Sequence, residues 1–351
     1  MQLSGLLGSA LSFVIRSVFK KTELPFLIVL NNKEEAAYYL NDLEQMIGEQ
    51  DVLFYPGSFR RPYQIEETDN ANVLLRAEVL NRINSRKKPA IIVTYPEALF
   101  EKVVTRKELD KNTLKVAVGD KISIDFINEV LFEYEFKRVD FITEPGEFSV
   151  RGGIVDVFSF SNDNPYRIEF FGDEVESIRT FDVATQLSIE TQKKITIIPN
   201  VENKFFQENR ESFLDYISAK TVIFIQNTED FLSQLDKQFG KAEEAFAKLS
   251  QEIKRSSPEQ LFLNQAEFIK RALDFSIVEL SSKAIFRTTK KIEFHIQPQP
   301  SFNKQFDLLL NNLNENHFNG YKNHLFCSND AQAKRFHDIF ETLDEANSEN
   351  I

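Results

Sequence analysis

The sequence predicts an α/β protein in which a parallel sheet is interrupted by an inserted α+β unit with an antiparallel sheet. Toward both ends of the chain, short runs of wholly apolar residues alternate with amphipathic stretches, a pattern typical of parallel strands covered by helices. In the middle, apolar and polar residues alternate strictly, as in antiparallel strands with one solvated face. We therefore place segments at residues 1–112, 113–199 and 200–351, and expect the last to complete the first.

The composition is that of a globular protein that does not work mainly on nucleic acid. The 351 residues include 42 basic and 54 acidic side chains, and the net charge of −12 has the wrong sign for neutralising phosphates. Any nucleic-acid contact is expected to be local or supplied by a partner. The single Cys327 cannot form an internal disulfide, and no apolar run approaches the ~20 residues of a membrane span. We expect a cytoplasmic protein without signal peptide or membrane contact.

The first segment follows the alternation expected of a parallel sheet. Apolar residues spaced by three and four predict an amphipathic helix within residues 3–19, after a glycine-bearing loop. Further elements are expected as strands at 26–30, 52–55 and 90–93, and as helices at 33–47 and 72–84.

The pattern of apolar and polar residues changes after residue 106. A strand at 114–118 and a helix at 125–136 precede three segments with period-two patterning, separated by glycine-containing turns. These segments are 139–143, 147–158 and 166–181, and a strand at 193–199 closes the unit. The alternation then resumes with a helix at 213–217, a strand at 222–225, a polar helical region at 230–255, a strand at 325–327 and a helix at 331–343.

The opening residues have the length and position of a phosphate-binding loop but lack its chemistry. In the pattern G-x-x-x-x-G-K-[ST], glycines let backbone amides converge on phosphate and the lysine adds charge. Gly5 and Ser12 are in place, whereas Ala10 stands at the second glycine and Leu11 at the lysine. We interpret the loop, with Gly8, as degenerate and non-functional; the plain alternative is a helix start with small residues for close packing. No strand ends in two carboxylates suited to magnesium, so catalysis is not expected.

The hairpin over residues 164–175 carries an aromatic residue on its polar face. If every second residue of the strand, beginning with Tyr166, packs inward, then a phenylalanine on the other face lies in water between charged residues. The preceding strand repeats this logic, with Arg151 outward before Gly152-Gly153. Such a surface is typical of a protein-binding hot spot; the alternative packs the aromatic ring against the helix at 125–136. The inward set is Tyr166, Ile168 and Phe170, and the outward set is Arg167, Glu169 and Phe171.

The run EPGEFSVRGGIVDVF at 144–158, continued at 166–182, resembles the amino-terminal UvrB-homologous module of the bacterial transcription-repair coupling factors (Mfd). The resemblance extends over nearly the whole chain and is strongest at 95–199. It implies a decayed RecA-like, helicase-type half with an inserted domain that binds UvrA, the ATPase of nucleotide excision repair. The positions that match the UvrA-binding surface are Arg151, Arg167 and Phe171, with Glu169 as a weaker candidate.

The resemblance implies an adaptor for DNA repair that has no chemistry of its own. It would recruit UvrA to RNA polymerase stalled at damaged DNA, as a fragment of a longer motor protein. RNA polymerase and DNA would be bound by the rest of that protein, ATP and magnesium by its translocase domains, and its own carboxy-terminal domain would mask the UvrA surface. This chain would need no cofactor. Where UvrB carries a hairpin that clamps damaged DNA, it has only a short polar segment through Arg60, Arg61 and Tyr63.

Two other functions stay open on the sequence. One is a UvrB-like ATPase or helicase half with residual nucleotide or DNA binding. The other is direct DNA binding through the basic clusters at 60–61 and 86–88, although such clusters are usually solvated loops. No metal site is expected, because the four histidines lack a short ligand spacing with one another or with the cysteine. These residues are His295, His317, His324, His337 and Cys327.

Overall fold

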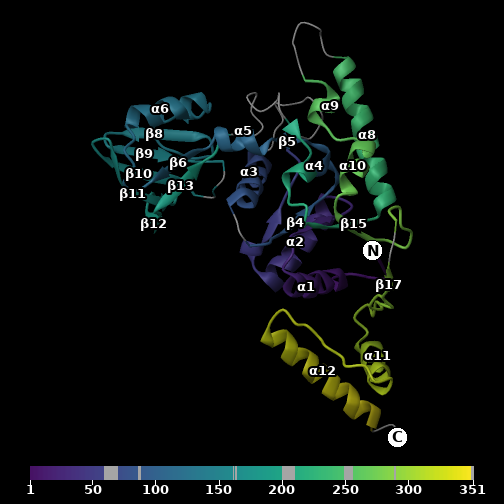
Figure 1. Cartoon of the computed structure of the whole chain (residues 1–351). Helices are drawn as coiled ribbons and strands as arrows, with labels where there is room; N and C mark the ends of the chain where they lie inside the picture. Colours follow the sequence, from purple (N-terminus) through teal and green to yellow (C-terminus); the bar gives the residue numbers. More distant parts are fainter. Residues whose placement is uncertain are drawn as a thin grey trace. The chain divides into compact units, whose positions relative to one another are not determined.

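The computed structural model describes residues 1–58, 70–85, 88–160, 162, 164–199, 210–248, 256–287 and 290–348. The chain divides into two compact units, residues 1–296 and 297–351 (Figure 1). None of the helices in the described residues is both long and apolar enough to span a lipid bilayer.

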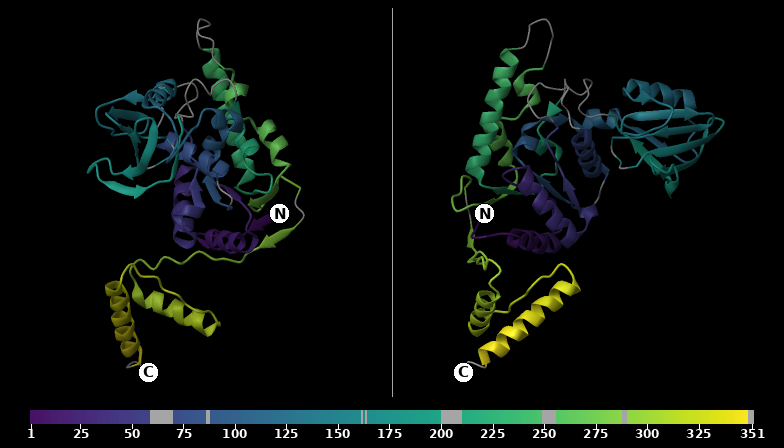
Figure 2. Two further views of the ribbon diagram at one scale, coloured as in Figure 1. Left: turned by 60° about the vertical axis from the view of Figure 1, so that its left-hand side comes forward. Right: turned by 180° about the vertical axis from the view of Figure 1, so that it is seen from behind.

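A seven-stranded sheet, parallel throughout, forms the centre of the first unit. Its strand order is β17-β1-β16-β15-β2-β4-β3, so strands from before and after the inserted domain belong to one sheet (Figure 2). The residues of β2 and β4 are all buried, as expected for strands covered on both faces. The strands are β1 (Gln2–Ser4), β2 (Phe26–Val29), β3 (Val52–Phe54), β4 (Ile91–Thr94), β15 (Val222–Gln226), β16 (Ser276–Leu280) and β17 (Lys291–Glu293).

The direction in which the chain crosses the sheet places the helices in two layers. From β1 through β2 to β3 the chain moves one way across the sheet, and from β3 onward it moves back. Because crossovers between parallel strands are right-handed, α1 (Ala10–Thr22) and α2 (Lys33–Ile47) lie on one face and the later helices on the other. The contacts agree: α1 packs on α2, and α8 packs on α4 and α10. The later helices are α3 (Asn70–Ser85), α4 (Pro96–Phe100), α8 (Thr228–Ala247) and α10 (Gln265–Ala272).

Side-chain caps mark where several of these helices begin. Asn32, Asn227 and Asn264 each accept a hydrogen bond from a backbone N–H one turn into α2, α8 and α10, at 2.9, 3.4 and 2.8 Å. Such caps satisfy amide groups that have no partner within the helix. The short elements are η1 (Glu49–Asp51), α5 (Arg106–Lys111), α7 (Phe213–Tyr216) and α9 (Pro258–Leu261), with β5 (Val103–Val104) paired to β14 (Arg210–Glu211).

The inserted domain holds a second sheet of six strands in the order β12-β11-β10-β9-β8-β7. All neighbours are antiparallel except β7 and β8, which run parallel. A separate antiparallel pair joins β6 (Leu114–Ala117) to β13 (Lys194–Ile197), and α6 (Ile124–Glu133) buries Ile127 and Leu131. The strands of the larger sheet are β7 (Lys137–Arg138), β8 (Glu147–Arg151), β9 (Ile154–Val157), β10 (Tyr166–Phe171), β11 (Glu174–Phe181) and β12 (Ser188–Thr191).

The predicted fold class is confirmed, but several predicted elements differ. The first helix begins only at Ala10, because Gly5 and Gly8 have positive φ angles of 75° and 53°. Residues 139–143 form no strand, since Glu147 holds the end of this segment in a turn. Residues 325–327 form none either, and Phe326 is 92% exposed. The strands β1, β16 and β17 were not expected, because they are short and lack a long apolar run.

The second unit consists of α11 (Phe306–Phe318) and α12 (Asp330–Ser348), which contact each other. Phe336 contacts the rings of Phe306 and Phe340, at 5.9 and 5.8 Å between centroids. Leu310 is the one buried hydrophobic residue among those described in this unit, so its core is small. The domain boundaries proposed from the sequence stay predictions; the compact units divide at residue 296, inside the predicted last segment.

A buried ion pair holds the segment that follows β3. Arg76 on α3 is fully buried, and its Nη1 atom lies 3.4 Å from a carboxylate oxygen of Glu101 and donates to the carbonyl of Pro56 at 2.9 Å. Glu101 in turn accepts from the N–H and hydroxyl groups of Ser58. The guanidinium also stacks on the ring of Tyr55, 4.5 Å from its centroid. One ion pair thus ties α3, α4 and this segment together.

We expect Arg76→Ala to lower the free energy of unfolding by about 3 to 5 kcal/mol, because it removes the cation that lies beside the buried Glu101 carboxylate. Urea denaturation followed by circular dichroism measures this loss. Arg82→Ala is the matched control, because Arg82 pairs with Glu78 on the surface of the same helix and such pairs contribute about 0.5 kcal/mol. Equal unfolding midpoints for the two variants would contradict the prediction.

Candidate functional site

The strand β10 has one buried and one solvated face, as predicted. Tyr166, Ile168 and Phe170 are buried, whereas Phe171 at the end of the strand is 80% exposed. The alternative in which Phe171 packs against the helix is therefore wrong. Burial also raises the pKa of the Tyr166 hydroxyl to about 12, so this group is uncharged at neutral pH. We call the solvated side the polar face; it comprises Arg151, Asp156, Arg167, Glu169, Phe171, Ser177 and Arg179.

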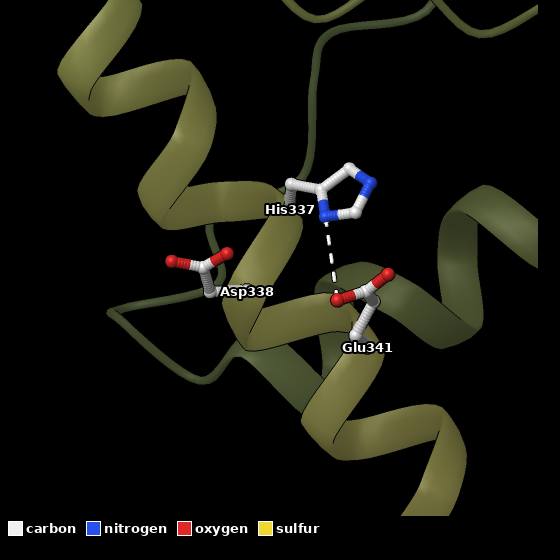
Figure 3. Close-up of side chains that lie close together, drawn as sticks. All are labelled: His337, Asp338 and Glu341. Atoms are coloured by element: carbon white, nitrogen blue, oxygen red, sulfur yellow. Dashed lines mark ion pairs between the residues drawn. The ribbon is translucent and has the colours of Figure 1, made fainter.

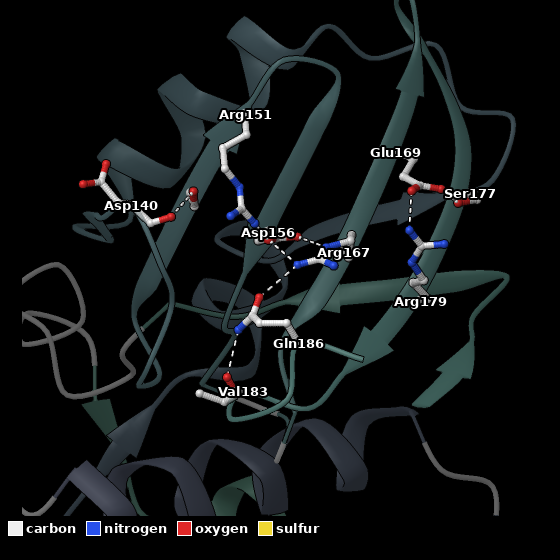
Figure 4. A network of polar contacts seen from close by, with 10 residues as sticks. Asp140, Arg151, Asp156, Arg167, Glu169, Ser177, Arg179, Val183 and Gln186 are labelled. Carbon is white, nitrogen blue, oxygen red and sulfur yellow. Dashed lines mark hydrogen bonds and ion pairs between the residues drawn. The ribbon is translucent and has the colours of Figure 1, made fainter. Parts of the chain in front are cut away.

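Asp156 on β9 is the centre of the polar face (Figure 4). It is 1% exposed, and its carboxylate accepts hydrogen bonds from Arg167 Nε at 2.7 Å and Arg167 Nη2 at 2.8 Å, and a third from Arg151 Nη2. The hydrogen bonds to Asp156 raise the pKa of the Arg167 guanidinium. The pairing follows from sheet register, which places Asp156 directly opposite Arg167. Bidentate pairs of this kind fix both direction and distance.

Arg167 is held on two further sides. Its guanidinium lies over the ring of Phe181, 4.3 Å from the centroid, and Nη2 donates to the side chain of Gln186 at 3.2 Å. Gln186 is itself fixed by donating to the carbonyl of Val183 at 2.8 Å. The side chain of Arg167 is 14% exposed and that of Arg151 is 41% exposed. Both arginines lie on the face predicted from the sequence, but both already bind Asp156 within the sheet, and Arg151 is the more accessible of the two.

A second charge pair lies beside the first. Glu169 accepts hydrogen bonds from Arg179 and from the hydroxyl of Ser177, both on β11. Register places Arg167 directly opposite Arg179, and each of these like charges is paired with a different carboxylate. The network therefore joins three arginines to two carboxylates. Glu174, opposite Phe171 in the register, adds an exposed third carboxylate to the polar face.

Tight turns end the strands next to the exposed phenylalanine. Gly152 and Gly172 have φ angles of 59° and 64°, which favour glycine. Gly153 approaches β10 so closely that a Cβ atom would lie 3.0 Å from the Phe170 carbonyl. The turn sequence RGGI thus brings Arg151 and the end of β10 together on one rim of the sheet.

Glu147, the first residue of β8, binds the chain that precedes it. Its carboxylate accepts hydrogen bonds from the N–H of Thr143 at 2.8 Å, the Thr143 hydroxyl at 2.9 Å and the N–H of Glu144 at 3.2 Å. Burial raises the pKa of this carboxyl, but the hydrogen bonds and the nearby Lys137 outweigh it, so the pKa lies below its ordinary value. Glu147 thus anchors the turn that leads into the polar face.

The opening loop has a different environment from a phosphate-binding loop. A Cβ atom on Gly5 would lie 1.8 Å from the carbonyl oxygen of Phe294, so the chain after β17 lies directly against it. Leu11, at the position of the motif lysine, is buried in the core. The hydroxyl of Ser12, which would face magnesium in the motif, donates to Asp42 at 3.1 Å.

One group of possible metal ligands lies on α12 (Figure 3). His337, Asp338 and Glu341 have ligand atoms within 4.8 Å of one another, and all three are exposed. His337 Nδ1 lies 3.5 Å from a Glu341 oxygen, one helical turn away, which favours an ordinary surface pair. The expectation of no metal site stays a prediction. Of the basic clusters weighed for DNA binding, Arg60, Arg61, Arg86 and Lys87 lie outside the described residues, as does Tyr63 of the polar segment.

Comparison with known proteins gives a match for the inserted domain. Residues 114–203 match the family model of the UvrB interaction domain. This confirms the resemblance inferred from the RGGIVDVF run.

Relatives extend the similarity beyond that domain. The chain is 34% identical over 218 residues to the transcription-repair-coupling factor of Bacillus subtilis, and 30% identical over 204 residues to that of Rickettsia bellii. These alignments cover 62% and 58% of this chain but 18% of each relative. The factor of Escherichia coli is 24% identical over 197 residues, 56% of this chain and 17% of its own length. The chain therefore matches less than one fifth of these relatives.

Sequence reasoning missed the groups that support the arginines. Asp156 interrupts an apolar strand between two valines, and an acidic residue at such a position was a signal that it needs a buried cation. Gln186 gave no signal, because its contact with Arg167 depends on a loop conformation with a positive φ of 60°. The UvrA-binding roles given to Arg151, Arg167, Phe171 and Glu169 stay predictions.

We expect Glu147→Gln to flatten the dependence of stability on acid pH. A carboxyl whose pKa is lowered by folding stabilises the fold above its unfolded pKa, near 4.5, and this contribution is lost as pH falls through the lower, folded value. The variant should therefore be less stable than wild type at pH 7 and lose less stability between about pH 5 and pH 3. Urea unfolding at a series of pH values measures both, with Glu176→Gln as an exposed control on β11. Parallel profiles for Glu147→Gln and wild type would show that the carboxylate does not act this way.

Proposed function

We propose that the polar face of the inserted domain binds UvrA, and that this chain is a non-catalytic module that recruits UvrA during transcription-repair coupling. The match to the UvrB interaction domain supports UvrA as the partner, and the similarity to transcription-repair-coupling factors supports a role in that process. The observation that carries the proposal is the 80% exposure of Phe171 beside a paired arginine network. A large aromatic side chain in water between charges is costly for a free surface and typical of a docking one.

The geometry gives the four candidate residues different roles in this proposal. Phe171 enters an apolar pocket of UvrA, and Arg151, with its more exposed guanidinium, pairs with a carboxylate there. Arg167 acts mainly as a support, because Asp156, Phe181 and Gln186 already surround it. Glu169 orients Arg179 at the margin of the face. Preformed charge pairs lower the ordering cost of association, because fewer side chains are immobilised on binding.

Alanine at Phe171 or Arg151 should weaken UvrA binding by about 1 to 4 kcal/mol, with little change in unfolding temperature, because both side chains are substantially exposed. Arg167→Ala should weaken binding and lower stability together, because Asp156 loses its bidentate partner. Titration of purified UvrA by calorimetry and thermal denaturation measure the two effects.

Lys194→Ala serves as the control in that experiment, since Lys194 is an exposed cation on β13, in the smaller sheet. The proposal fails if UvrA binds all three variants as tightly as wild type, or does not bind the wild-type chain at all.

The rest of the proposal concerns what this chain does not do. The loop residues do not fit a nucleotide phosphate chain: the motif lysine is the buried Leu11, the Ser12 hydroxyl is bound to Asp42, and the Phe294 carbonyl would repel phosphate beside Gly5. We therefore propose that this chain binds no cofactor. In a longer parent protein, translocation with ATP and magnesium, contacts with RNA polymerase and DNA, and masking by a carboxy-terminal domain would belong to other segments.

A titration with labelled ATP and magnesium should give no saturable binding by this chain, because the buried Leu11 stands at the position of the motif lysine and the Ser12 hydroxyl is bound to Asp42. A P-loop ATPase titrated in parallel verifies that the assay detects nucleotide. Saturable binding that disappears in Ser12→Ala would favour the alternative, a UvrB-like ATPase half.

A further inference from the structure

A second exposed aromatic residue borders the polar face. Phe141, between β7 and β8, is 65% exposed, yet its neighbours in the chain are fixed. Ile142 is buried with Phe158 and Phe181 in a small hydrophobic cluster. On the other side, the carbonyl of Asp140 accepts a hydrogen bond from the hydroxyl of Ser149 at 3.1 Å (Figure 4). The ring is therefore held in water by anchors on both sides.

The whole segment around Phe141 is tied to β8. The N–H of Val139 donates to the carbonyl of Phe148 at 2.9 Å, and the Glu147 carboxylate holds Thr143. A surface ring on a segment fastened at three points loses little conformational freedom when it enters a partner. Such pre-organisation distinguishes Phe141 from a ring on a loose loop.

Phe141 also lies next to a residue of the polar face. The guanidinium carbon of Arg151 lies 5.3 Å from the centroid of its ring, within the range of a cation–π contact. Arg151 binds Asp156, which binds Arg167, so a continuous series of contacts runs from Phe141 to the centre of the face. Phe171 lies on the same face beyond Glu169, which places the charged network between two exposed rings.

We propose that Phe141 is a second apolar anchor of the same docking surface, and that it binds UvrA beside Arg151. This inference rests on the proposed function. The occupant follows from continuity with that surface and from charge: the charge next to Phe141 is the accessible Arg151 guanidinium, so this part of the face fits a partner surface that offers a carboxylate beside an apolar pocket. Charged groups enclosed by aromatic rings also lose water on binding, which strengthens their pairing with the partner.

Another exposed aromatic in the domain lies elsewhere and provides a matched control. Phe126 on α6 is 48% exposed. Its helix packs on the opposite side of the sheet, because Phe132 of α6 contacts the ring of Phe148, which points away from the polar face. Phe126→Ala therefore removes a similar exposed ring without touching the proposed surface.

The test is UvrA binding by the full chain carrying Phe141→Ala, Phe141→Leu, Phe126→Ala or Arg151→Ala, measured at several salt concentrations. We expect Phe141→Ala to weaken binding about tenfold, which corresponds to about 1.4 kcal/mol. Its salt dependence should equal that of wild type, since no charge is lost, whereas Arg151→Ala should reduce the salt dependence. Phe141→Leu should retain most of the affinity, because it keeps the apolar contact. Phe126→Ala should bind like wild type.

The outcomes separate this inference from the proposed function. If Arg151→Ala weakens binding and Phe141→Ala does not, the inference is wrong and the proposed function stands. If Leu and Ala at position 141 weaken binding equally, Phe141 only orients Arg151 and is no anchor. If the wild-type chain does not bind UvrA, both are overturned. Unchanged thermal denaturation of Phe141→Ala verifies that any loss arises at the surface.

Discussion

A single buried carboxylate determines the arrangement of the candidate docking face. Asp156 is almost fully excluded from water and is stabilised by two guanidinium groups from neighbouring strands. An isolated carboxylate in this place would be strongly unfavourable, so the strands cannot slip in register without leaving it unpaired. The same pairing that satisfies Asp156 fixes Arg151 and Arg167 before any partner arrives. The pairing of Asp156 with two arginines therefore both fixes the register of the strands and holds the arginines in place before a partner binds.

The parallel sheet is subject to a different constraint, because it is assembled from two separate stretches of chain. β15 lies between β2 and β16, so strands from after the insertion occupy the middle of the sheet, next to strands from before it. Removing the insertion would leave this sheet's strand pairs intact, since none of them involves a strand of the inserted domain. This separation allows exposed residues such as Phe171 to be altered without breaking a strand pair of the parallel sheet.

Period-two patterning predicted the hairpin of β10 and β11 and its exposed Phe171, because a strand with one buried face has alternating apolar and polar residues. Fully apolar runs predicted β2, β4 and β15 for a similar reason. The short strands β1 and β17 could not be predicted, since a strand of three residues is too short to show a distinctive pattern. At the site, the outward arginines were predicted, but their shared partner was not, because cross-strand pairing depends on register that alternation alone does not determine.

The opening loop and the polar face differ in whether the residues around them permit binding of a ligand or partner. A lysine at the position of Leu11 would have to leave the core to reach a phosphate, and the buried position instead contributes apolar packing to α1 against the sheet. The loop can therefore serve the fold or a nucleotide, but not both with this residue. The polar face has no such conflict. Asp156 satisfies the charges internally, while the rings of Phe171 and Phe141 remain in water, where burying them requires a second surface. Burial of these two rings is therefore the free energy that the inserted sheet can contribute to association.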